Sequence, residues 1–354
     1  MFDASYFRAL VSGQQRGLRA SLLRTSLSLA EPFYRLGVQW RNRQFDTGKR
    51  KVHRVDVPVI SVGNLTVGGT GKTPMVEWLA RWFRERGVRV ALVSRGYGAE
   101  AGSRNDEALE LEQKLPDVPH LQNPNRVEAA QTAIDECDTQ LILLDDAFQH
   151  RRIHRDLNIV LIDALEPFGY GHLLPRGLLR EPVANLKRAD VIVLSRSDAV
   201  GDETRAAIRS KAMQHAPQAA WLEVAHRPQS LLSADGKEIP INSLQGQRVT
   251  AFCGIGNPAG FRHTLAELGA EVVDFREFPD HHSYQRRDIE DLTSWARALR
   301  VTAILCTHKD LVKVGVEQLG ACPLFALRIG LAVSDGVDTL TNRLEAIARS
   351  IRPT

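Results

Sequence analysis

Short apolar segments alternate with amphipathic segments along most of the chain from residue 57 onward. Continuous apolar runs between helices are typical of parallel strands that are covered on both faces. Five such runs are predicted as strands, at residues 57–62, 88–94, 141–145, 158–163 and 190–194. Residues 73–86 have a helical pattern, and Gly87 follows as the expected C-terminal cap. The pattern therefore predicts a three-layer α/β sheet.

The pattern changes between residues 226 and 245. Ala234-Asp235-Gly236-Lys237 is typical of a hairpin turn, so we expect a β linker here. A second, smaller α/β set follows, with strands expected at 248–253, 271–275, 301–307 and 324–329, helices ending near Leu268 and Leu299, and a last helix over 337–351. The predicted parts are an N-terminal helix with its connection (1–54), a nucleotide-binding domain (55–225), the linker (226–245) and a C-terminal lobe (246–354).

The first 36 residues have a helical pattern of their own. Pro32 is expected to break or kink this helix near Glu31. Such a helix can lie in a membrane interface or dock on its own protein, and the pattern alone does not decide between them. Arginines lie off an apolar stripe that is about 80° wide. The stripe consists of seven apolar residues at helical spacing: Phe7, Val11, Leu18, Leu22, Leu29, Phe33 and Leu36.

Charge is distributed unevenly along the chain. Residues 1–54 contain 11 Lys and Arg against 3 Asp and Glu, whereas the rest contains 35 against 39. The net charge of +4 is therefore concentrated at the N-terminus, which points to an anionic partner there. The apolar runs are far shorter than the roughly 20 residues that span a bilayer. The N-terminus also lacks the pattern of a secretory signal.

The composition is that of an ordinary soluble globular protein, with 43% hydrophobic and 25% charged residues. Its four cysteines are scattered and form no CxxC pair. This spacing indicates neither a zinc site nor a disulfide framework, and it fits a reducing, cytoplasmic setting.

A glycine-rich turn lies between the first predicted strand and the first helix after it. Consecutive backbone N–H groups in such a turn can bind one anion, and the helix dipole favours negative charge at the same place. Lys72 is expected to reach the β- and γ-phosphates of a nucleoside triphosphate, and Thr73 to offer its hydroxyl to Mg²⁺. The first glycine of the usual motif is replaced by Thr66. The predicted nucleotide-binding residues are Thr66, Val67, Gly68, Gly69, Thr70, Gly71, Lys72 and Thr73.

Two acids end the apolar run 141–144. Asp145 and Asp146 should emerge at the carboxyl edge of the sheet, where an open α/β sheet binds its ligands. They are the expected metal ligands, although two aspartates capping a following segment would look the same. The basic loop 149–155 comes next. It could hold an anionic substrate or simply be a solvated loop, and composition favours the second interpretation.

Several segments resemble the tetraacyldisaccharide 4′-kinase family of lipid A biosynthesis. The strongest match is Ser61-Val62-Gly63-Asn64-Leu65 continuing through the glycine-rich turn to Pro74. The resemblance covers nearly the whole chain, to about Lys313, and the combination of motifs is highly specific. Further matching segments lie at residues 94–98 (Ser-Arg-Gly-Tyr-Gly), 145–151 (Asp-Asp-Ala-Phe-Gln-His-Arg), 174–182 (Leu-Pro-Arg-Gly-Leu-Leu-Arg-Glu-Pro), 254–258 (Gly-Ile-Gly-Asn-Pro) and 278–284 (Phe-Pro-Asp-His-His-Ser-Tyr).

This resemblance implies a P-loop kinase that uses ATP and Mg²⁺. The expected acceptor is the 4′-hydroxyl of a lipid-linked glucosamine disaccharide 1-phosphate. The resemblance also implies a peripheral enzyme at the cytoplasmic face of the inner membrane, which favours a membrane-surface role for the N-terminal helix.

The resemblance also suggests residue roles. Asp106 would accept the proton of the sugar hydroxyl, and His281 would orient or tune Asp106. Glu181 would join the metal ligands, and Arg126, Arg176 and Arg180 would contact phosphate. Three positions depart from the family pattern: Asn105 replaces Gly, Ala108 replaces Pro, and His308 replaces Glu.

The sequence disfavours two other classes of protein. A regulatory GTPase would carry an Asn-Lys-x-Asp motif, but the matching strand end reads Ser195-Arg196-Ser197-Asp198. The lysine that marks partitioning ATPases is replaced by Val67. A nucleic-acid-binding module is disfavoured because the N-terminal arginines surround an apolar stripe without an aromatic stacking platform.

Overall fold

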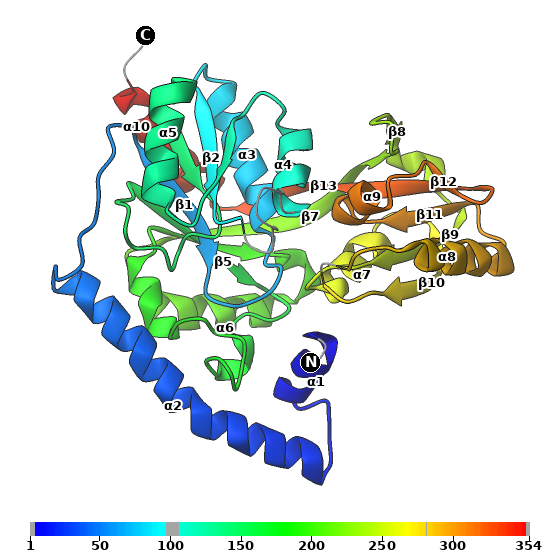
Figure 1. The fold of residues 1–354 in the computed structure, drawn as a ribbon, viewed down its shortest axis with the longest axis horizontal. Helices are drawn as coiled ribbons and strands as arrows, with labels where there is room; N and C mark the ends of the chain where they lie inside the picture. The colour runs from blue at the N-terminus through cyan, green and yellow to red at the C-terminus, as the bar shows by residue number, and fades with distance from the viewer. Residues whose placement is uncertain (1–3, 97–105, 281, 352–354) are drawn as a thin grey trace. The chain divides into compact units, whose positions relative to one another are not determined.

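A computed structural model describes residues 4–96, 106–280 and 282–351 (Figure 1). The chain divides into two compact units. The first comprises residues 1–225 and the chain from Val333 onward, and the second comprises His226–Ala332. The prediction had placed all of 246–354 in the second lobe. The chain instead returns through the long strand β13 (Cys322–Asp335) to the first unit, where Leu340 and Leu344 of α10 (Val337–Ser350) are buried.

The first unit is built on a parallel sheet in the order β7-β6-β5-β1-β4-β2-β3. Its strands are β1 (Val59–Asn64), β2 (Val90–Ser94), β3 (His120–Gln122), β4 (Leu141–Leu144), β5 (Leu157–Asp163), β6 (Val191–Ser195) and β7 (Ala220–Leu232). The five predicted strands are confirmed with small shifts at their ends. All residues of β1, β2, β4 and β6 are buried, as expected for strands covered on both faces.

Helices cover both faces of this sheet. One face is covered by α5 (Arg126–Cys137) and α6 (Asp202–Met213), whose alanines and Ile208 pack on β4 and β5. Right-handed crossovers place α3 (Lys72–Arg84) and α4 (Asp106–Lys114) on the other face, where they contact each other. The three-layer α/β fold of the P-loop type is therefore confirmed.

The N-terminus forms two helices, not one. Gly13 and Gly17 adopt left-handed φ angles of 86° and 109° and separate α1 (Ala4–Val11) from α2 (Leu18–Asp46). The break expected near Glu31 is wrong, because α2 continues through Pro32 for another 14 positions, whereas the alternative of a kink stays a prediction. Tertiary contacts of Glu31 and Tyr34 on both sides of the proline hold the helix in place.

The second unit has a smaller parallel sheet in the order β10-β9-β11-β13. The helices α7 and α8 pack on opposite faces of β9. Val249, Ala251 and Cys253 cluster with residues of α7, whereas Phe252 clusters with residues of α8. The predicted hairpin pairs Ser230 of β7 with Pro240 of β8. The remaining elements are β8 (Glu238–Pro240), β9 (Arg248–Cys253), α7 (Pro258–Ala266), β10 (Glu271–Glu277), α8 (Arg286–Leu299), β11 (Ala303–Cys306), α9 (His308–Val314) and β12 (Gln318–Leu319).

Candidate active site

The glycine-rich turn joins the end of β1 to the start of α3, as the sequence predicted. Gly68 and Gly71 adopt φ angles of 114° and 82°, which side chains rarely tolerate. A hydrogen bond joins the two ends of the turn, because the side-chain amide of Asn64 donates to the hydroxyl of Thr70 over 3.0 Å. Lys72 and Thr73 occupy the first turn of α3. The turn therefore has the strand–loop–helix setting that phosphate binding requires.

A distant segment holds the first half of this turn. The Val67 N–H donates to the Leu178 carbonyl over 2.8 Å, and the Arg180 N–H donates to the Leu65 carbonyl over 2.7 Å. Together with a bridge between Thr66 and Leu179, these bonds extend the turn as a short antiparallel pair. The 174–182 motif thus shapes the phosphate loop through its backbone. Side-chain reasoning from the sequence did not anticipate this role.

Asp146 lies opposite the loop, immediately beyond β4. Its carboxylate lies 3.4 Å from the Lys72 ammonium and accepts two bonds of 2.9 and 2.8 Å from the Arg180 guanidinium. Burial opposes ionisation of this carboxyl, but Lys72 and Arg180 prevail and hold its pKa well below the ordinary value. Asp146 therefore presents a carboxylate that is ionised at physiological pH beside Lys72, and its backbone has a left-handed φ of 46°.

Asp145 and Arg126 complete this side of the site. The Asp145 carboxylate accepts a 2.8 Å bond from the Asp146 N–H. The guanidinium of Arg126 is buried and donates to the backbone carbonyls of both aspartates, each over 3.1 Å. The structure thus shows Arg126 supporting the acidic turn, whereas its predicted contact with phosphate stays a prediction.

The carboxylate of Glu181, a predicted metal ligand, contacts three other side chains of the protein. Its side chain is fully buried, and Arg41 of α2 approaches one carboxylate oxygen to 3.0 Å. Arg188 and Asn185 contact the other oxygen. Both oxygens therefore have protein partners in the structure, and the predicted metal coordination by Glu181 stays a prediction. Arg176, a predicted phosphate contact, donates to the Val11 carbonyl at the end of α1 over 3.2 Å.

The basic loop after β4 is docked on other parts of the fold, whereas its composition favoured a solvated loop. Arg151 donates to the Asn42 carbonyl and pairs with Asp46, both on α2. Arg155 donates to the carbonyls of residues 147 and 148. Burial, together with the charges of Arg126 and Arg155, lowers the pKa of His150 to about 4. His150 is therefore neutral at physiological pH.

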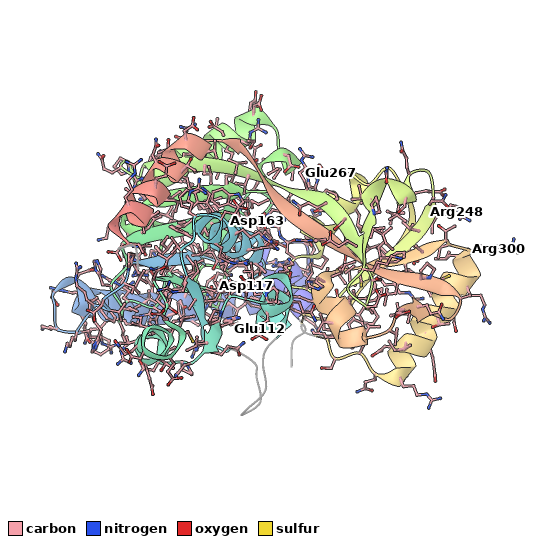
Figure 2. The ribbon with its side chains drawn as sticks, turned by 90° about the horizontal axis from the view of Figure 1, so that it is seen from above. Glu112, Asp117, Asp163, Arg248, Glu267 and Arg300 are labelled. Carbon is pink, nitrogen blue, oxygen red and sulfur yellow. The ribbon has the colours of Figure 1, made fainter. Side chains whose placement is uncertain are left out.

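The far side of the phosphate loop is held by the ends of β5 and β6. Ser195 donates from its hydroxyl to the Thr70 carbonyl over 2.8 Å, and Arg196 donates to the Gly69 carbonyl over 3.0 Å. Arg196 also lies 2.7 Å from the carboxylate of Asp163, which is labelled in Figure 2. These contacts were not predicted, because the sequence marks Ser195 and Arg196 only as a strand end that departs from the guanine-reading motif.

The predicted proton acceptor and its partner cannot be placed. Asp106 is the first residue of α4, but its side chain lies outside the described residues, as does all of His281. The neighbouring motif residues of the second unit are described. Asp310 accepts bonds from the Gly254 N–H (3.0 Å) and the Tyr284 hydroxyl (2.9 Å), so the 254–258, 278–284 and 307–310 segments meet at one buried carboxylate.

The fold and this site define a P-loop phosphotransferase: a glycine turn after β1, a lysine at the start of α3 and an ionised carboxylate beyond a neighbouring strand. A family model described as tetraacyldisaccharide-1-P 4′-kinase matches residues 23–348, and the chain belongs to that family.

Similar proteins agree with this assignment. A tetraacyldisaccharide 4′-kinase of Anaeromyxobacter sp. (strain Fw109-5) is 39% identical over 92% of both chains. The enzyme of the same name from Geobacter sulfurreducens is 36% identical and covers 92% of this chain and 94% of its own. A crystal structure of LpxK from Aquifex aeolicus in complex with ATP is 29% identical, with a TM-score of 0.71 over 92% of this chain and 99% of that one.

Proposed function

We propose that this protein transfers the γ-phosphoryl group of ATP to the 4′-hydroxyl of a tetraacylated glucosamine disaccharide 1-phosphate. The observation that carries the proposal is the pairing of Lys72 with Asp146 beside the glycine turn, in a chain that belongs to the 4′-kinase family. Phosphoryl transfer needs positioning and electrostatic stabilisation more than covalent chemistry. Lys72 and the loop N–H groups supply both for the β- and γ-phosphates.

The residues around the loop fit Mg²⁺. Thr73, Asp145 and Asp146 offer a hydroxyl and two carboxylates, the hard oxygen ligands that this ion prefers. Lys72 and Arg180 keep Asp146 ionised, so at least one carboxylate is ready to bind a cation without first losing a proton. A bound Mg²⁺ would neutralise charge on the phosphate oxygens. Arg180 and Arg126 remain candidates for contacts with phosphate, the former beside Asp146 and the latter behind it.

The acceptor chemistry is proposed from the family resemblance. Asp106 would accept the proton of the 4′-hydroxyl, and His281 would orient or tune its carboxylate. A positioned general base contributes about 10²- to 10⁴-fold to rate. Its contribution appears in turnover and not in the affinity for ATP.

The protein would act at the cytoplasmic face of the inner membrane, where its lipid acceptor is held. Within the described part of the chain, no helix is both long and apolar enough to cross a bilayer. The support for surface binding is α2, whose large apolar side chains at six positions are 61–85% exposed: Leu18, Leu22, Leu29, Phe33, Leu36 and Trp40. These positions fall within about 60° of one helix face. Such a face suits the boundary between headgroups and acyl chains.

One experiment separates the two proposed roles. Asp106→Ala should lower turnover by about 10²-fold or more and leave the dissociation constant for ATP nearly unchanged. Lys72→Ala should weaken ATP binding as well as turnover, because Lys72 faces the phosphates in both ground and transition states. Turnover and ATP binding are measured on the same preparations, with exposed Lys187→Ala as control. Equal losses of ATP affinity and turnover in Asp106→Ala would show that Asp106 is a binding residue.

A further inference from the structure

The ends of β5 and β6 contact the phosphate loop through its carbonyl groups. Ser195 donates to the Thr70 carbonyl and Arg196 to the Gly69 carbonyl, over 2.8 and 3.0 Å. Both side chains are buried, Ser195 fully and Arg196 to 7% exposure. These two carbonyls belong to consecutive peptide groups in the half of the loop that leads into α3.

The direction of a carbonyl fixes the direction of the next N–H. In a trans peptide the C=O and N–H bonds lie in one plane and point in opposite directions. A Gly69 carbonyl held toward Arg196 therefore turns the Thr70 N–H away from the end of β6. A Thr70 carbonyl held toward Ser195 does the same for the Gly71 N–H. A phosphate loop needs consecutive N–H groups that point toward one anion. These two hydrogen bonds determine the direction of the Thr70 and Gly71 N–H groups.

Arg196 has features that stability alone does not explain. Its backbone adopts a left-handed φ of 52°, which is unfavourable for a residue with a side chain. Its guanidinium forms a buried ion pair with Asp163, and a buried ion pair is weak evidence for stabilisation because desolvation offsets the attraction. Asp163 instead fixes the guanidinium so that another of its nitrogens reaches the Gly69 carbonyl.

We propose that Ser195 and Arg196, with Asp163 behind Arg196, are positioning residues that orient the N–H groups of Thr70 and Gly71 for the phosphates of the nucleotide. They act through the loop backbone. The inference rests on the proposed binding of ATP by this loop. It assigns a role to the strand end at which a GTPase would carry its guanine-reading motif.

The chain offers matched controls for both residues. Ser197 also donates its buried hydroxyl to a carbonyl, that of Val224, but this carbonyl is not in the phosphate loop. Arg205 donates to the carbonyls of residues 197 and 200 and pairs with Glu223, again without contacting the loop. Comparing Ser195→Ala with Ser197→Ala, and Arg196→Gln with Arg205→Gln, separates general stability from loop orientation.

The test measures displacement of a fluorescent ATP analogue by ATP and by inorganic pyrophosphate, without acceptor, alongside the melting temperature of each free protein. Ser195→Ala should weaken both competitors about two- to ten-fold, and Arg196→Gln about ten-fold or more. The controls should stay within about two-fold even where their melting temperature falls. Arg196→Lys should keep the charge opposite Asp163 without recovering affinity, because an ammonium lacks the guanidinium fork.

Two outcomes would overturn the inference. One is equal affinity in Ser195→Ala and Ser197→Ala. The other is full recovery of pyrophosphate affinity in Arg196→Lys, which would reduce the role of Arg196 to its charge. A wild-type protein that binds neither ATP nor pyrophosphate would instead contradict the proposed function itself, so the two failures are distinguishable.

Discussion

At the scale of single residues, the side chain of Glu181 has partners that its sequence motif did not predict. Its position in the 174–182 motif suggested a metal ligand, whereas the structure surrounds its carboxylate with Arg41, Arg188 and Asn185. The residue directly follows Arg180, which binds the carboxylate of Asp146. The arginine partners come from α2 and from residues further along the chain, so no local pattern could have revealed them.

These partners predict the effect of Glu181→Ala. Removing one partner of a buried ion network leaves the remaining charges without compensation, which costs about 3–5 kcal/mol. The free energy of unfolding from urea denaturation should fall by that amount, whereas Glu203→Ala on the exposed side of α6 should change it little. Wild-type stability combined with a raised Mg²⁺ requirement would favour the metal-ligand role.

His150 predicts a pH dependence of stability. Its folded-state pKa is lowered to about 4 from an ordinary value of 6.5. Between these values the unfolded chain binds a proton that the folded chain does not. The contribution of His150 is therefore fully present above pH 6.5 and is lost as the pH falls toward 4. His150→Gln should show a shallower loss of unfolding free energy over this range by denaturant titration, and an unchanged slope would contradict the assignment.

At the scale of elements, α2 has a buried face and an exposed apolar face. Glu31 accepts bonds from the Leu173 N–H and His172, and the Tyr34 hydroxyl donates to the Arg180 carbonyl. The buried face thus docks on the 172–181 segment, which in turn pairs with the phosphate loop. The other face is the exposed apolar stripe. The docking interpretation is therefore confirmed for the buried side of α2, and the membrane interpretation stays a proposal for its exposed side.

The exposed stripe of α2 predicts the behaviour of a double variant. Leu22→Glu/Phe33→Glu should lower partitioning onto anionic lipid vesicles by at least about ten-fold, because each large apolar side chain contributes about 1.5–3 kcal/mol when buried. Both positions are 70% or more exposed, so the fold should be unaffected. Ser28→Glu/Gln39→Glu adds the same charge off the stripe and serves as the control. Equal vesicle binding by both double variants would contradict the proposal, and co-sedimentation measures it.

The elements of the first unit were largely predictable, and the reasons are local. The strands β4 and β6 are continuous apolar runs, and the turn before α3 carries its own glycines. The division of the N-terminal helix was missed because apolar periodicity continues across Gly13 and Gly17, whereas the break depends on their left-handed backbone. The pairing of residues 178–180 with the phosphate loop was not predicted, because it is made by backbone hydrogen bonds that do not depend on which side chains are present.

At the scale of the whole molecule, the first unit concentrates the chemistry at one edge of its sheet. Asn64, Asp146, Asp163 and Ser195 lie at or just beyond the ends of β1, β4, β5 and β6, and all four contact the phosphate loop or a residue bound to it. The order β6-β5-β1-β4 places the loop between an acidic side and a side that holds its carbonyls. The sequence predicted the acidic side, because its aspartates end an apolar run. It did not predict the opposite side, where Ser195 and Arg196 bind the carbonyls of the loop.

The central claim is ATP-dependent phosphorylation of the 4′-hydroxyl, and a product assay tests it most directly. The protein is incubated with Mg²⁺, ATP or GTP, and a tetraacylated disaccharide 1-phosphate in detergent micelles, and the lipid product is identified by mass and by the position of the new phosphate. We expect a 1,4′-bisphosphate that forms with ATP. Absence of lipid product together with robust GTP turnover would contradict the claim.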